Sequence, residues 1–201
     1  MKNLRKLLIL VLLIGATTGA KSQVLISLLF GDALNTEKIE FGLIGGLNRS
    51  YLLDIEESKG LNNFNIGFYF HINMFKTSYL STGVLVKSNV GAEGMPVYSV
   101  GDPDFDDVYS EGELTKKMNY FYVPILWQQR FNNRWYLEGG LQLGLRNKAY
   151  DYFTIEKEEE YGGQLGYKRD VRDEYTHFDG GLIGGAGYKF RKEIKSMAVG
   201  V

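Results

Sequence analysis

The sequence lacks cysteine altogether and has only two histidines and three prolines among its 201 residues. The absence of cysteine excludes disulfides, thiolate metal ligands, a cysteine nucleophile and a cysteine-linked lipid anchor. An excess of either charge is also missing: 23 basic and 24 acidic residues give a net charge of −1, which does not favour a nucleic-acid partner. The longest apolar run, Leu7 to Ile14, is far shorter than a membrane-spanning helix of roughly 20 residues.

The start of the chain has the composition of a secretory signal peptide. Basic residues come first, the apolar run follows, and Ala20-Lys21-Ser22 offers a cleavage site. A buried amphipathic helix is the alternative, but the order of charged, apolar and small residues favours export. The sequence therefore predicts a signal peptide over residues 1–22 and one domain over residues 23–201.

Glycine and strict two-residue alternation are what the sequence does contain. Glycine accounts for 25 residues, spread through the chain. Between Trp135 and Arg146, an apolar set alternates with a set of glycine and polar residues, which predicts a two-faced strand. This stretch is longer than an average strand of roughly 5–6 residues and suits a tilted crossing of a bilayer. The same alternation recurs at 39–48, 63–75, 80–89, 118–130 and 176–190, and begins again at 197–201.

The spacing of these segments predicts an all-β, antiparallel, up-and-down transmembrane β-barrel. Short turns alternate with long charged loops, as in outer-membrane barrels. A soluble lipocalin-like barrel has the same alternation with its apolar face inside, but the glycine-rich second face favours a narrow lumen. Since bacterial barrels use an even number of strands, we expect eight, with the last missing from this chain. Aromatic residues near the short turns are expected at the membrane interface: Tyr79, Trp127, Trp135, Tyr188 and Phe190.

Several stretches carry a family resemblance. They are FGDALNTEKIEFGL at 30–43, TGVLVKSN at 82–89, YVPILWQQRF at 122–131 and YLEGGLQLG at 136–144. Together with the signal peptide, they resemble the PorT-like outer-membrane β-barrel family of Bacteroidota. The resemblance implies a barrel in the bacterial outer membrane. It implies little about activity, since most members have no known function and one branch is linked to protein secretion.

Charged residues on the second face are expected to point into the lumen. They are Glu40, Lys87, Arg130, Glu138, Arg146, Asp179 and Lys189. Buried charges must be paired, so we expect a network of ion pairs that fills the lumen, with an ion path or proton relay as the alternative. The two histidines, His71 and His177, are expected at opposite ends of the barrel, which argues against a shared metal site.

No catalytic, cofactor or metal site is predicted, and we expect no enzyme. His177 and Asp179 would lie at the outer rim with Ser88 or Ser110 as a nucleophile, but residues at i and i+2 do not form a triad and a Gly-x-Ser-x-Gly elbow is missing. The acidic segment Gly101 to Asp107 offers carboxylates to calcium without the EF-hand spacing, so a solvated loop is expected.

These observations predict a small outer-membrane barrel with a filled lumen and a structural or interaction role through its external loops. Its expected partners are outer-membrane lipid and envelope or secretion proteins. Three other hypotheses remain open from the sequence: a narrow pore for small solutes, a lipid-modifying enzyme at the rim, and a soluble periplasmic barrel that binds an apolar ligand.

Overall fold

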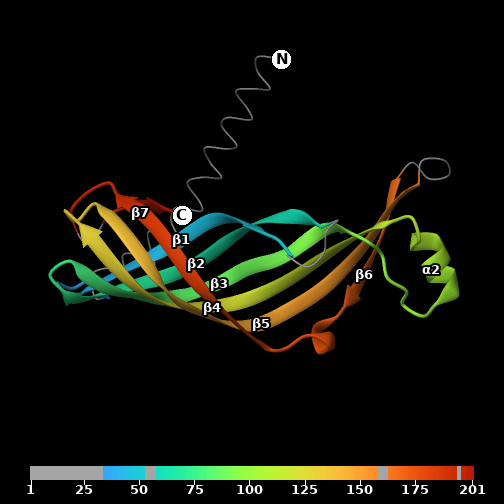
Figure 1. Ribbon diagram of the computed structural model, residues 1–201, viewed down its shortest axis with the longest axis horizontal. Helices are drawn as coiled ribbons and strands as arrows, with labels where there is room; N and C mark the ends of the chain where they lie inside the picture. Colours follow the sequence, from blue (N-terminus) through green and yellow to red (C-terminus); the bar gives the residue numbers. More distant parts are fainter. Residues whose placement is uncertain (1–33, 53–57, 158–162, 194–195) are drawn as a thin grey trace, which may run out of the picture.

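The computed structural model describes residues 34–52, 58–157, 163–193 and 196–201, which form one antiparallel sheet that curls into a half-barrel (Figure 1). The predicted signal peptide lies outside the described residues. The strands are β1 (Ile39–Ser50), β2 (Lys59–Phe75), β3 (Ser78–Met95), β4 (Glu113–Phe131), β5 (Trp135–Lys157), β6 (Gly163–Asp170), β7 (Phe178–Lys189) and β8 (Ala198–Gly200). The short helices α2 (Pro103–Tyr109) and η1, a 3-10 helix (Arg172–Glu174), accompany them.

The strand order is that of an up-and-down sheet, as predicted. Neighbours follow the chain from β1 to β5 and then β7 and β8, while β6 also pairs with β5. β7 lies along the first half of β5, up to the pair Leu145–Phe178, and β6 lies along the second half from the pair Tyr150–Asp170. β6 and β7 therefore lie on the same side of β5, one after the other along its length, and η1 separates them in the chain. The hairpin between β4 and β5 turns at Asn132 and Asn133, both with positive φ, as the Asn-Asn pair predicts.

In the part of the sheet next to the short turns, the apolar set of each strand faces outward, on the convex side. On β5, Leu137, Leu141 and Leu143 are all more than half exposed, while Arg146 in the alternate set is 8% exposed. This arrangement is the reverse of a soluble barrel, which buries its apolar set. The convex face is thus a belt of lipid-facing side chains, and the concave face is the predicted lumen face.

Tyrosine rings explain why the concave face is rich in glycine. Tyr69 is paired with Gly42, and Tyr122 with Gly144, across neighbouring strands. A Cβ placed on Gly42 would lie 2.5 Å from the Tyr69 hydroxyl oxygen, and a Cβ on Gly144 would lie 2.5 Å from the Tyr122 ring. Each glycine leaves the space that the neighbouring ring fills, which packs the narrow interior.

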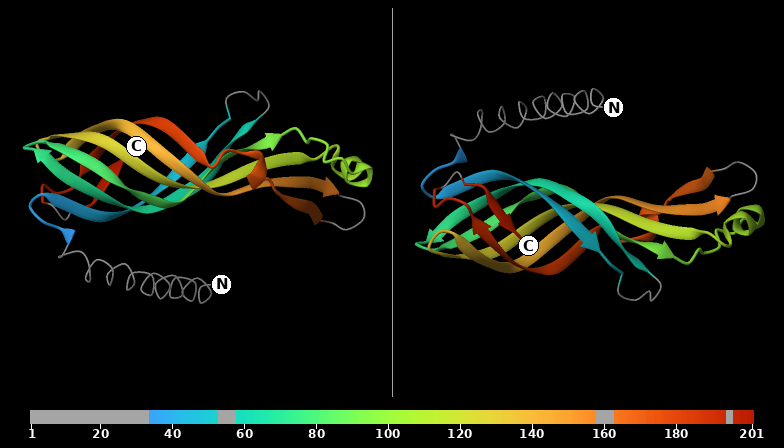
Figure 2. Two further views of the ribbon diagram at one scale, coloured as in Figure 1. Left: turned by 90° about the horizontal axis from the view of Figure 1, so that it is seen from below. Right: turned by 90° about the horizontal axis from the view of Figure 1, so that it is seen from above.

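The strands extend well beyond the predicted bounds, so the segments expected as long loops are largely structured. β5 runs on to Lys157 because its alternation resumes, with inverted phase, beyond a register shift where Tyr120 pairs with Arg146 and Asn119 with Lys148. Within the described ranges, none of the helices is long and apolar enough to cross a membrane. Figures 1 and 2 show α2 and β6 at one end of the molecule, opposite the short turns.

The extended strand ends and α2 enclose a small hydrophobic core of their own, and we call this part of the molecule the outer cap (residues 90–118, 148–157 and 163–175). Its fully packed members are Ala92, Met95, Tyr109, Leu114 and Phe153. The helix begins where Asp102 accepts hydrogen bonds from the backbone amides of Asp104 and Phe105, with Pro103 in the first turn. Its Phe105 ring then stacks edge-on against Phe153, 5.3 Å between centroids. The acidic segment therefore starts a helix and is not the predicted loop, although Asp102, Asp104 and Asp107 are exposed to solvent as expected.

Candidate functional site

A cluster of buried ions spans the concave face at the end with the short turns. Glu40 on β1 accepts hydrogen bonds from Arg130 on β4, with Nη1–Oε1 at 2.7 Å and Nη2–Oε2 at 2.8 Å. Lys189 on β7 donates to the same Glu40 Oε1 at 3.0 Å. All three residues are at most 5% exposed. These contacts join three strands from different parts of the sheet through one carboxylate. We call the cluster of Glu40, Arg130 and Lys189, together with the side chains that contact it, the ion plug.

Neutral side chains complete the hydrogen bonding of the ion plug. Arg130 Nε donates to Gln128 Oε1 at 2.7 Å, and Gln128 Nε2 donates to Glu138 Oε2 at 2.8 Å. Arg130 Nη2 also lies 2.8 Å from His71 Nδ1. The same Nδ1 lies 3.4 Å from Glu40 Oε2, but the contact with Arg130 is the shorter one, and since a guanidinium can only donate, it favours Nδ1 as the acceptor in a neutral imidazole. The guanidinium carbon of Arg130 lies 3.7 Å from the centroid of the Tyr79 ring, so this ring packs against the face of the cation.

The predicted lumen charges divide into separate groups. Glu40, Arg130 and Lys189 meet directly, and Glu138 joins them through Gln128. Arg146 instead donates to the carbonyl oxygen of Thr176 at 2.9 Å, and Asp179 accepts from the Tyr122 hydroxyl at 2.8 Å.

The structure corrects the prediction for Lys87, which is exposed and lies over the Phe64 ring at 4.1 Å on the convex face. The reason is an extra residue in β3 between Leu85 and Ser88, which reverses the inward set beyond it. A bulge of this kind leaves the alternation of hydropathy almost unchanged, so the pattern alone does not reveal it.

His177 and Asp179 do not form a catalytic pair. His177 Nδ1 lies 3.4 Å from Arg146 Nη2, whereas Asp179 is bound to Tyr122. Ser88 is buried opposite Tyr120, and Ser110 ends α2 on the exposed surface. The residues considered for a hydrolase therefore lie at different places with different partners.

Four of the five predicted interface aromatics lie on the convex side near the short turns. Trp135 packs on Tyr188 with 4.7 Å between centroids, Tyr188 meets Phe190 at 5.9 Å, and Trp127 is 47% exposed. Tyr79 is the exception, because it pairs with Gln128 in the inward set and lies under Arg130. It belongs to the ion plug and not to the interface.

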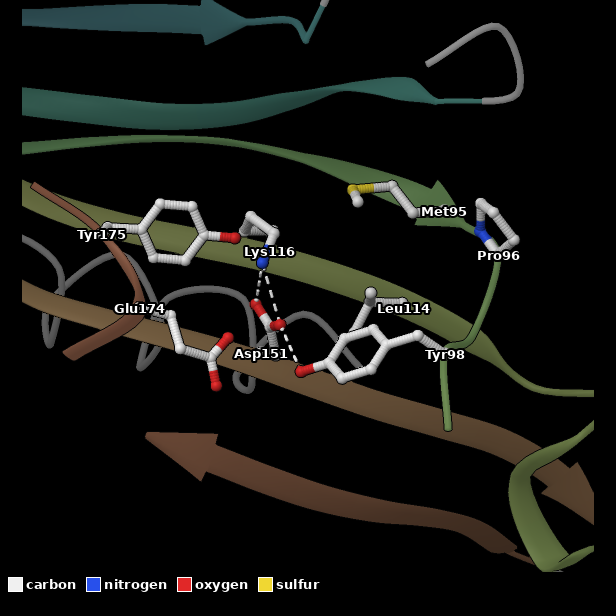
Figure 3. A pocket seen from close by; sticks show the side chains of 8 residues that line it. All are labelled: Met95, Pro96, Tyr98, Leu114, Lys116, Asp151, Glu174 and Tyr175. Carbon is white, nitrogen blue, oxygen red and sulfur yellow. Dashed lines mark hydrogen bonds and ion pairs between the residues drawn. The ribbon is translucent and has the colours of Figure 1, made fainter. Parts of the chain in front are cut away.

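The outer cap contains a cavity of about 370 Å³ that sequence reasoning missed (Figure 3). Its described lining residues are Met95, Pro96, Tyr98, Leu114, Lys116, Asp151, Glu174 and Tyr175. Lys116 Nζ lies 2.7 and 2.8 Å from the two carboxylate oxygens of Asp151, which also accepts from the Tyr98 hydroxyl at 2.8 Å. Figure 3 shows this pair at the centre, with Tyr175 and Glu174 on one side and the apolar residues on the other.

A chain of charge-assisted contacts continues from the cavity to β6. Arg169 Nη1 donates to the Tyr98 oxygen at 2.8 Å, and Arg169 Nη2 pairs with Glu174 at 2.8 Å. Burial, followed by the hydrogen bond to Asp151, raises the pKa of Tyr98 to about 12. Burial by itself lowers the pKa of Lys116, but the hydrogen bonds to Asp151 and Tyr175 outweigh it, so the net shift is upward. Tyr98 and Lys116 are thus held in their protonated forms.

These residues suit binding better than reaction. The described lining has no histidine and no serine or threonine hydroxyl, and its central lysine and aspartate neutralise each other. What remains for a ligand is an apolar floor, two phenol rings and the partly exposed Glu174. The signal that could have located the cavity is the alternation Ala149, Asp151, Phe153, which places a charge between two core positions.

The acidic segment forms local caps instead of assembling metal ligands. Asp102 caps α2, and Asp106 accepts from the Ser99 hydroxyl at 2.5 Å and from the Val100 amide at 2.9 Å. These hydrogen bonds lower the pKa of Asp106. Over the described ranges, no cluster of three or more histidine, aspartate or glutamate side chains has a geometry that could hold a metal ion.

A curled antiparallel sheet with an apolar convex face, interfacial aromatics and a charged concave face defines a β-barrel membrane protein. The chain belongs to the family described as outer membrane protein beta-barrel domain, whose sequence pattern matches residues 29–200. This membership places it in the outer membrane. No curated protein and no solved structure matches the chain.

Proposed function

We propose that this protein is a solute-impermeable outer-membrane barrel that acts through its outer cap, in a structural or interaction role. The proposal includes export by the predicted signal peptide and a place beside envelope-assembly or secretion proteins, as the resemblance to PorT-like barrels suggests. The observation that carries it is the contrast between the two ends: ions and rings fill the interior at one end, and a folded cap stands at the other.

The filled interior argues against transport. A conducting pore needs a polar path, but Glu40 is bound by Arg130 and Lys189 and no longer presents a free charge to an ion. Small barrels of about eight strands have interiors that side chains fill. The ion plug therefore acts as a structural cross-brace.

The outer cap supports an interaction role because it has a hydrophobic core and a cavity that are separate from the barrel interior. The cap has its own core around Phe153, and its cavity opens beside Tyr98 and Tyr175, two amphipathic rings that give contact area at low entropic cost. A partner's side chain or a small ligand would meet these rings and the Glu174 carboxylate.

The test is a pair of measurements on the full-length protein. In planar bilayers, folded wild-type protein should give no stable conductance steps, while replacing Glu40, Arg130 and Lys189 together by serine should produce them. In cells, a photo-crosslinker at Tyr175 should give a defined adduct, whereas one at Lys76 in a short turn should not. Stable wild-type conductance, or equal crosslinking at both sites, would contradict the proposal.

A further inference from the structure

The convex face changes character sharply where the strands leave the apolar belt. On β4 and β5, the last exposed apolar residues are Phe121 and Leu145. A row of asparagines follows: Asn119 Nδ2 donates to Asn89 Oδ1 at 2.9 Å, and Asn147 Nδ2 donates to Asn119 Oδ1 at 3.4 Å. This polar row marks the level at which the surface passes from hydrocarbon to headgroups.

Directly beyond this row lies a set of residues that we call the basic patch: Lys117 on β4, Lys148, Tyr150 and Tyr152 on β5, and Lys168 on β6. Lys117 is paired with Tyr150, and Lys168 with Tyr152, so the five side chains are neighbours on one face. The residues between them, Lys116, Asp151 and Arg169, turn inward to the cavity, which leaves the basic patch facing out.

One lysine of the basic patch, Lys168, rests on tyrosine rings and not on a carboxylate. Lys168 Nζ lies 3.6 Å from the Tyr150 ring centroid and 5.6 Å from that of Tyr152. The neighbouring Asp170 is held by Arg172, with Nη2–Oδ2 at 2.9 Å. In the part of the chain that the structure describes, none of the ion pairs uses a lysine of the basic patch.

The height of Lys117 and Lys148 matches the headgroup layer, and the ammonium group of Lys168, whose backbone pairs with Tyr152, reaches back to the Tyr150 ring at 3.6 Å. Lys148 comes three residues after Leu145, and Lys117 four residues before Phe121 along the chain. At about 3.4 Å per residue and a tilt of roughly 45°, these steps correspond to a rise of about 7–10 Å above the belt. The headgroup layer adds roughly 5–8 Å on each side of the hydrocarbon core, within reach of a lysine side chain.

We propose that the basic patch binds the phosphate groups of lipid headgroups in the leaflet around β4, β5 and β6. Ammonium groups at this height attract anionic headgroups, and interfacial tyrosines place their rings against the acyl boundary with the hydroxyl toward water. The lipid would contact Phe121 and Leu145 with its chains and the lysines with its phosphate. The convex face would then hold specific lipids beside the outer cap.

The test uses the purified full-length protein in detergent, with bound lipid counted by native mass spectrometry during titration with dioleoylphosphatidic acid. Replacing Lys117, Lys148 and Lys168 together by glutamine should weaken binding about tenfold or more, with the difference shrinking at high salt. Dioleoylglycerol, which lacks the phosphate, should bind weakly to both proteins. Lys59→Gln is the matched control, because Lys59 is exposed and already lies 3.9 Å from Glu113.

Three outcomes would overturn the proposal: unchanged phosphatidic acid binding in the triple variant, an equal loss in Lys59→Gln, or displacement of the lipid by inorganic phosphate at similar concentrations. The last result would indicate a free-phosphate site. Folding of each variant is checked by its mobility shift on boiling. If the triple variant does not fold, Lys168→Gln should still lose affinity while Lys168→Arg keeps it.

Discussion

Glu40 and Arg130 lie 90 residues apart in the chain and face each other across the concave side of the sheet in a two-point ion pair, both contacts at 2.7–2.8 Å. The planar guanidinium matches the carboxylate with two parallel hydrogen bonds, a geometry that an ammonium cannot reproduce. β1 and β4 are not neighbours in the sheet, so this pair acts as a cross-brace through the interior.

Removing one partner of this pair should be costly. Glu40→Gln leaves the buried Arg130 and Lys189 cations without a carboxylate, and breaking a buried ion pair in this way costs about 3–5 kcal/mol of unfolding free energy. The measurement is urea-induced unfolding in detergent or lipid, in which the loss of the gel mobility shift reports the unfolded fraction. Glu111→Gln, on the exposed surface, serves as the control and should be neutral. Equal stability of the two variants would contradict the cross-brace.

The glycine–tyrosine packing gives a second prediction. Gly144→Ala forces the Tyr122 ring away from its hydrogen bond with Asp179, so we expect a loss of about 1–3 kcal/mol, as for other overpacked cores. Gly46→Ala is a matched control in β1, because a Cβ there meets nothing within 4 Å. The same unfolding assay should rank Gly46→Ala near wild type. The reverse ranking would show that the rings do not pack on glycine.

Alkaline pH should loosen the outer cap. Tyr98 has an ordinary pKa of 10.0 in the unfolded chain and one of about 12 in the fold. Between these values the unfolded chain releases a proton that the folded cap retains, so the stability contribution is complete below pH 10 and is lost as the pH rises toward 12. The raised pKa of Lys116 acts in the same direction. The tyrosinate absorbance difference between wild type and Tyr98→Phe should titrate near pH 12, whereas a midpoint near 10 would contradict the buried hydrogen bond.

The outer cap should unfold without the barrel. Phe153 is fully buried at the centre of the cap core, and truncation of a buried phenylalanine costs about 3–5 kcal/mol. Phe153→Ala should therefore speed proteolysis between residues 90 and 118 while the heat-dependent mobility shift persists. Leu165→Ala, a 45%-exposed position in β6, is the control. Loss of the mobility shift in Phe153→Ala would mean that cap and barrel fold as one unit.

The two-residue alternation was sufficient to predict the strand order, the lipid-facing set and most of the concave set. It predicted Arg130 and Lys189 on one face because, next to the short turns, the alternation of inward and outward side chains in β4 and β7 is not interrupted by a bulge. The pattern failed at bulges: Lys87 follows an extra residue in β3, and the phase of β5 inverts between Arg146 and Lys148. Bulges shift every later side chain to the other face without a clear mark in hydropathy.

The outer cap could be predicted only in part. The signal for α2 was present, with Asp102 and Pro103 at its start and Phe105 and Tyr109 four apart on one face, but the run of carboxylates favoured a solvated loop over a calcium site. The alternation Ala149, Asp151, Phe153 marks only the β5 wall of the cavity, and the full set could not be predicted, because Lys116, Asp151 and Tyr98 come from three separate segments. Only the pairing register brings them together.

The apolar set faces lipid and the alternate set faces the interior, and the cysteine-free sequence makes this orientation directly measurable. Single cysteines replace Leu141 and its neighbour Gln142, on opposite faces of β5, in protein reconstituted into lipid vesicles. We expect a fluorophore at Leu141→Cys to be quenched by lipid-borne quenchers and one at Gln142→Cys to be protected from them. Strong lipid quenching at Gln142→Cys with protection at Leu141→Cys would mean that the apolar set faces the interior, and would contradict the orientation of the strands.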